Sequence, residues 1–246
     1  MSGHSHFSTI KHKKEASDAK RSKMFSKLSR QITIAAGEKG GDPETNPSLR
    51  LAVEQAKKLN MPKENVERAI KKGTGELEGE ILEHFSFEAY GPGGTALIIE
   101  GITDNKKRTL SEIKQILASK KGKLVSEGSV RWMFEKKGCL VLREESQKEE
   151  LKAKEKLEMA AIESGADDIE WEEGAFFVYT KPEELDKTKK LLEEKGAEIE
   201  SAYLDWVPKE RIKIDSEAEK EYQNLFESLD ENDSVQDVFS NFETEN

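Results

Sequence analysis

The chain has one cysteine among 246 residues, which excludes an internal disulfide and any metal site built from paired cysteines. No apolar run approaches the roughly 20 residues of a membrane-spanning helix. No Gly-x-x-x-x-Gly-Lys-Ser/Thr loop and no Gly-x-Ser-x-Gly turn occurs. We therefore expect no cofactor, no metal, no small-molecule substrate, no enzymatic activity and no membrane contact.

The few candidates for reactive groups also have simpler interpretations. Cys139 begins the apolar run 139–142, which is typical of a buried strand rather than of a reactive thiol. The basic N-terminus is not followed by an apolar segment, so it does not resemble a secretory signal. We expect a cytoplasmic protein, and no palindromic dimer signal is visible, so we expect a monomer.

Charge is distributed unevenly along the chain. The whole chain has 40 Lys and Arg against 50 Asp and Glu, but residues 1–75 hold 16 basic and 8 acidic residues. Residues 215–246 hold eleven acidic residues and one basic residue, Lys220. A polyanionic partner should therefore meet the N-terminal part of the chain and be repelled by the rest.

The first thirty residues are the most basic stretch. Residues 1–17 have no helical periodicity, and we expect an arm that becomes ordered on a partner. From Asp18 onward, apolar residues recur every three or four positions and predict a helix with one buried face. Basic residues recur on the opposite side and predict a solvent-facing ridge, although any surface helix can carry lysines outward. The candidate phosphate contacts are His4, His6, Lys11, His12, Lys13, Lys14, Lys20, Arg21, Lys23, Lys27 and Arg30.

Two more helices follow. Asn46 and Pro47 predict an N-cap and a first helical residue, and a short turn at 60–62 leads into a helix over 63–72. A helix, a turn and a second basic helix permit a helix-turn-helix interpretation, but bundles also contain short turns. The further candidate contacts are Lys63, Arg68, Lys71 and Lys72.

Beyond residue 78 the pattern changes to strands alternating with amphipathic helices. Strands are predicted at 81–90, 95–103 and 129–135, with a helix from about Asn105. Residues 138–204 then follow the order β-α-β-β-α-β of a ferredoxin-like unit, with its first helix at 148–163. The expected class is α+β: a three-helix domain (1–78), a ferredoxin-like α+β domain (79–136 with 208–246), and a second ferredoxin-like α+β domain (137–207) inserted in that one.

Several motifs resemble the YebC/PmpR family, which is related to the mitochondrial translational activator of cytochrome c oxidase. They span nearly the whole chain and include Gly3-His4-Ser5, Asp18-Ala19-Lys20-Arg21, Gly41-Asp42-Pro43, Asn60-Met61-Pro62-Lys63, Tyr90-Gly91-Pro92-Gly93-Gly94, Thr103-Asp104-Asn105 and Gly128-Ser129-Val130. His6-Phe7 departs from the family's lysine-tryptophan pair. The resemblance implies a helical domain, two α+β domains and a cytoplasmic, probable DNA-binding transcriptional regulator.

Two kinds of nucleic-acid partner stay open at this point. Duplex DNA fits the family's usual description, whereas ribosomal RNA or the ribosome fits the mitochondrial relatives and the small size of the basic region. Both require phosphate contacts, so charge alone does not separate them. A module that binds other proteins through its acidic C-terminal segment is a third possibility.

Overall fold

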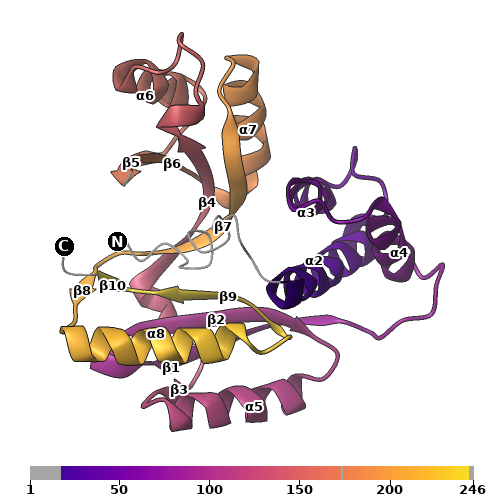
Figure 1. Ribbon diagram of the computed structural model, residues 1–246, viewed down its shortest axis with the longest axis vertical. Coiled ribbons are helices and arrows are strands. Elements are labelled where there is room, and N and C mark those ends of the chain that lie inside the picture. The colour runs from indigo at the N-terminus through magenta and orange to yellow at the C-terminus, as the bar shows by residue number, and fades with distance from the viewer. Residues whose placement is uncertain (1–17, 173, 244–246) are drawn as a thin grey trace. The chain divides into compact units, whose positions relative to one another are not determined.

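The computed structural model describes residues 18–172 and 174–243 and confirms the predicted α+β class (Figure 1). Residues 134–207 form one compact unit, and the described residues before and after that segment form the other. Within the described ranges, no helix is both long enough and apolar enough to cross a bilayer.

Three helices begin the larger unit: α2 (Asp18–Lys39), α3 (Pro47–Lys58) and α4 (Lys63–Gly73). The predicted cap of α3 is confirmed, because the side chain of Asn46 accepts a hydrogen bond from the Leu49 amide. Apolar residues of the three helices form one shared core, which comprises Leu28, Ile32, Ala35, Ala36, Leu49, Ala52, Val53, Ala56, Met61, Val66 and Ala69. The 3.6-residue period therefore identified the buried faces correctly.

A close approach between α2 and α4 fixes how these two helices meet. A Cβ atom on Gly73 would lie 2.2 Å from the carbonyl oxygen of Thr33, so only glycine fits at the end of α4. The Thr33 hydroxyl also donates a hydrogen bond to the Ala69 carbonyl at 3.1 Å. The two helices are thus held tightly at this end.

The α+β part of the same unit is a four-stranded sheet with two helices. Its strands are β1 (Glu83–Tyr90), β2 (Ala96–Thr103), β3 (Lys123–Val125) and β9 (Val235–Ser240), in the order β3-β1-β2-β9. Helices α5 (Lys106–Ser119) and α8 (Ser216–Asp230) both pack against the sheet (Figure 1). Strand β9, near the end of the chain, therefore pairs with β2 from its first half. Two further strands of two residues each, β8 (Ile212–Lys213) before α8 and β10 (Phe242–Glu243) after β9, pair with each other in parallel.

The other unit has the predicted ferredoxin-like order. It contains β4 (Phe134–Arg143), α6 (Lys154–Glu163), β5 (Asp168–Glu172), β6 (Ala175–Thr180), α7 (Leu185–Glu194) and β7 (Ile199–Pro208). The sheet order β5-β6-β4-β7 is the one expected for this fold. Cys139 lies buried in β4, as predicted, and burial raises the pKa of its thiol well above the usual value.

Two local predictions were wrong, and one short strand was missed. The strand predicted at 129–135 is a turn followed by a 3₁₀ helix, Arg131–Met133, and β4 begins only at Phe134. The short strand β3 was not predicted, because three residues are too few for a visible alternation. The helix predicted at 148–163 begins at Lys154.

Candidate nucleic-acid interface

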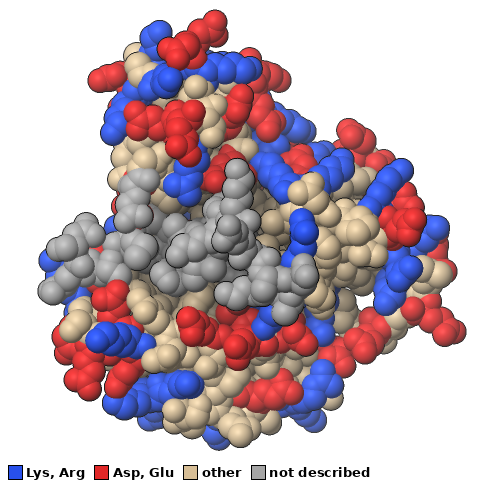
Figure 2. Space-filling model, in the orientation of Figure 1, with Lys and Arg blue, Asp and Glu red and all other residues tan. Residues whose placement is uncertain are grey.

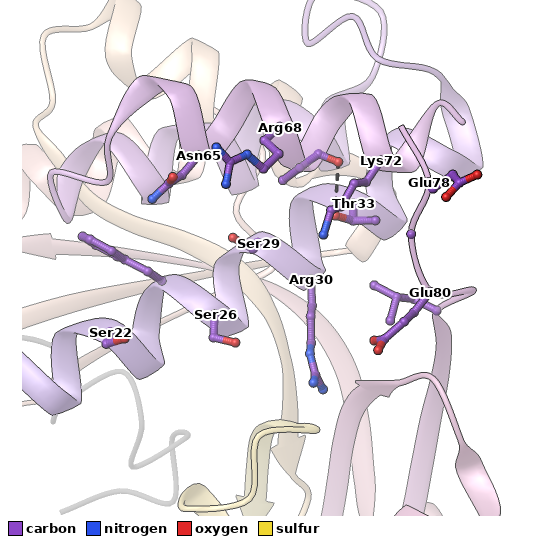
Figure 3. A pocket seen from close by; sticks show the side chains of 14 residues that line it. Ser22, Ser26, Ser29, Arg30, Thr33, Asn65, Arg68, Lys72, Glu78 and Glu80 are labelled. Atoms are coloured by element: carbon purple, nitrogen blue, oxygen red, sulfur yellow. Dashed lines mark hydrogen bonds between the residues drawn. The ribbon is translucent and has the colours of Figure 1, made fainter. Parts of the chain in front are cut away.

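A groove with a volume of about 790 Å³ lies between parts of α2 and α4 in the helical domain. Four hydroxyl side chains of α2 line it, together with Phe25 and Arg30 from the same helix (Figure 3). Asn65, Arg68 and Lys72 line it from α4. The hydroxyl residues are Ser22, Ser26, Ser29 and Thr33. Hydroxyl, amide and cationic groups are the ones that proteins use to contact nucleic-acid phosphates.

The hydroxyl row follows from the sequence of α2. Its members are spaced by four, three and four residues, so they lie along one side of the helix. At a rise of about 1.5 Å per residue, successive hydroxyl residues are about 4.5 to 6 Å apart along the axis. We did not predict this row from the sequence, although its helical spacing is visible there.

The basic residues of α4 divide between the groove and the outside. Arg68 and Lys72 are exposed and line the groove, and among the described residues neither has an acidic partner. Lys63 is exposed and lies 3.4 Å from the Glu67 carboxylate, and exposed Lys71 is not part of the groove lining. Because its groove side faces α2, α4 does not project these cations as a separate recognition helix (Figure 3).

The prediction of a solvent-facing ridge is wrong at Lys27. Its side chain is buried, and its ammonium nitrogen lies 2.6 Å from the Asp230 carboxylate at the end of α8. Burial lowers the pKa of Lys27, and the neighbouring carboxylate of Asp230 only partly opposes that effect. Lys27 therefore joins the helical domain to the α+β domain instead of facing solvent.

Arg30 also differs from the predicted ridge. Its guanidinium donates hydrogen bonds to the backbone carbonyls of Ile102 and Asp233 at 3.1 Å, and to the Ser234 hydroxyl at 3.3 Å. The side chain is half-buried and borders the groove. Arg30 thus fixes α2 on the α+β domain beside the groove.

The structure describes only some of the other residues predicted to contact phosphates. Arg21 is exposed and Lys23 is half-buried on α2. The side chain of Lys20 is outside the described ones, as are the arm residues His4, His6, Lys11, His12, Lys13 and Lys14. The arm predictions therefore stay predictions.

Acidic residues border one end of the groove. Glu78 and Glu80 belong to the segment between α4 and β1, and both contribute to the groove lining (Figure 3). They are exposed, as are Glu76 in the same segment and Glu83 at the start of β1. Figure 2 shows basic and acidic side chains both on the part of the surface formed by the helices and over the α+β domains. The groove is therefore basic along α4 and acidic where the segment leaves it.

Comparison with family models matches both parts of the chain. Residues 5–76 match the model described as the TACO1/YebC protein N-terminal domain. Residues 82–242 match the one described as the TACO1/YebC second and third domain.

Individual proteins agree over the full length. A protein of Halothermothrix orenii and one of Geobacter sulfurreducens are each 46% identical to this chain; the alignments cover 99% of it, and 95% and 96% of the relatives. Both are called probable transcriptional regulatory proteins. The crystal structure of a conserved hypothetical protein from Aquifex aeolicus superposes with a TM-score of 0.88 at 44% identity, covering 98% of both chains.

Proposed function

This chain belongs to the TACO1/YebC family, and we propose that it regulates gene expression by binding the sugar-phosphate backbone of nucleic acid in the groove between α2 and α4. The observation that carries the proposal is the groove itself, where Arg68 and Lys72 face a row of hydroxyl groups. We propose that the protein acts by binding, without catalysis, in the cytoplasm.

The name of the relatives makes DNA the first partner to test. A transcriptional regulator that acts directly on DNA contacts its phosphates, which supply a large share of the affinity of such complexes. Basic residues of the arm would extend the contact beyond the groove.

Ribosomal RNA is the second candidate, and the charge distribution favours it. The segment 215–246 carries eleven acidic residues and one basic residue, so it would repel a long duplex that wrapped around the protein. A contact confined to one groove suits a protein that docks on a large RNA at a single place.

The proposal predicts how binding responds to salt. We expect Arg68→Gln/Lys72→Gln to weaken binding and to lower the slope of log K against log salt by about 2, because each lost phosphate contact removes about 0.9 on a duplex. The measurement is fluorescence anisotropy of a labelled 20-base-pair DNA duplex, and in parallel of a ribosomal RNA hairpin, over a range of KCl concentrations.

The matched control is Lys156→Gln/Lys187→Gln. These two lysines are exposed on α6 and α7 in the other compact unit, and the double substitution removes the same charge. We expect its slope to equal that of the unchanged protein. Equal slopes for all three proteins on both probes would show that the groove does not hold phosphates. The probe bound more tightly at equal salt identifies DNA or RNA as the partner.

A further inference from the structure

The shape of the groove restricts the form of nucleic acid that it can hold. A protein that reads duplex DNA inserts a projecting helix or ribbon into a groove of the DNA. Here the geometry is reversed, because Arg68, Lys72 and Asn65 line a hollow in the protein. A hollow of this kind offers no projecting element to read the paired bases of a duplex, whereas an unpaired base of a single strand can enter it.

The composition of the lining points the same way. Sites for single-stranded nucleic acid combine a basic groove that follows the backbone with aromatic side chains on which bases stack. Phe25 lines this groove and is only partly buried, so part of its side chain can be contacted from the groove. Cations on α4 and hydroxyl groups on α2 surround Phe25. These groups can bind the phosphates and sugars of the strand whose base stacks on the ring.

We propose that the groove binds an unpaired, single-stranded segment of nucleic acid, with phosphates on Arg68 and Lys72 and a base stacked on Phe25. This inference rests on the proposed function and specifies its ligand. The acidic side chains Glu78 and Glu80 lie beside Lys72 at one end of the groove and repel a strand that would extend past that lysine, so the strand continues from the opposite end, where Ser22 lies (Figure 3).

The hydroxyl row bears on the sugar that is bound. A 2′-hydroxyl both donates and accepts hydrogen bonds, and serine and threonine hydroxyls can do the same. Single-stranded RNA and single-stranded DNA share the phosphates and the stacking bases, so both fit the groove, and a direct comparison of the two measures what the 2′-hydroxyl adds.

The test uses the full chain and three labelled probes of one mixed sequence: a 12-nucleotide RNA strand, the matching DNA strand and the DNA duplex. We expect at least one single strand to bind about tenfold more tightly than the duplex. Phe25→Leu should weaken binding of that strand by about five- to tenfold, because base stacking on an aromatic ring is lost. Phe25→Tyr keeps a ring and should bind like the unchanged protein.

Folding is controlled separately, since Phe25 also packs against the core of the helical domain. Leucine retains an apolar side chain, and thermal melting by circular dichroism verifies that the variant is folded. If the leucine variant melts at a much lower temperature, Phe25→Met replaces it, because the flexible thioether side chain fills irregular space better.

The possible outcomes separate the two proposals. Duplex binding as tight as single-strand binding, or a folded Phe25→Leu variant with unchanged affinity, overturns the single-strand inference. If Arg68→Gln/Lys72→Gln still lowers the salt slope in that case, the proposed function stands with a duplex ligand. If neither variant alters binding, both proposals fail.

Discussion

Glu88 is a buried charge whose partners lie about forty residues further along the chain. Its carboxylate accepts hydrogen bonds from the backbone amides of Gly128, Val130 and Arg131 at 2.8, 2.7 and 3.0 Å. Burial by itself would raise the pKa of Glu88, but these amides and the Arg131 guanidinium more than offset that effect and leave the pKa below its usual range. The ionised side chain therefore holds the turn before β4 in place.

We predict that Glu88→Gln destabilises the protein by about 2 kcal/mol at pH 7, because an amide group places N–H donors against backbone N–H groups. The folded-state pKa is depressed, so the stabilisation by Glu88 is present above the ordinary glutamate pKa of about 4.3 and is lost as the pH falls through the folded value. Thermal melts of both proteins should differ most above pH 5 and converge in more acidic buffer.

Glu83→Gln is the matched control for this prediction, since Glu83 is exposed on the same strand. It should change the melting temperature little at any pH. A difference between Glu88→Gln and the unchanged protein that stays constant from pH 3 to pH 7 would show that the charge of Glu88 does not stabilise the turn.

At the scale of elements, Lys27 connects α2 with α8 across 203 positions of sequence. The Asp230 side chain is partly exposed, whereas that of Lys27 is only 5% exposed. Removing one partner of such a pair leaves a buried charge without compensation, which costs more than the pair contributes. Together with the hydrogen bonds of Arg30, this contact sets the position of the groove on the α+β domain.

We predict that Lys27→Glu lowers the free energy of unfolding by about 3 kcal/mol, because a second carboxylate would be buried beside Asp230. Arg21→Glu makes the same charge change at an exposed position of α2 and should cost less than about 0.5 kcal/mol. The double variant Lys27→Met/Asp230→Leu should regain most of the loss, because apolar residues can replace a buried pair. Urea unfolding of the four proteins measures these differences, and equal stability of Lys27→Glu and Arg21→Glu would contradict the prediction.

The helices were predictable because their signals are local. The apolar period of α2 and the cap at Asn46 both lie within a few residues of the structure they specify. The position of Lys27 was not predictable, since a lysine that faces solvent and one that meets a distant carboxylate have the same local pattern. The turn at 129–133 was missed for a similar reason, because Glu88 determines it from another strand.

For the whole molecule, the uneven charge of the sequence has a structural counterpart. The helical domain carries the basic groove, and residues 215–246, which supply α8 and β9, carry a strong excess of acidic residues. Under the proposed function, this arrangement would confine a polyanion to the helical domain through repulsion as well as attraction. The sequence predicted that the basic residues concentrate in the N-terminal part of the chain, while the groove itself required the packing of α2 against α4.

The most direct test is to locate the contact in living cells. Ultraviolet crosslinking of the native protein, followed by mass spectrometry of the crosslinked peptides and sequencing of the attached nucleic acid, reports both partners of the contact. We predict crosslinks at Phe25 and its neighbours on α2, with single-stranded regions of one kind of nucleic acid attached. Trp132 is the internal comparator, because it is 65% exposed outside the helical domain. Crosslinks at Trp132 or elsewhere in the α+β domains, with none between residues 18 and 73, would contradict the assignment of the groove.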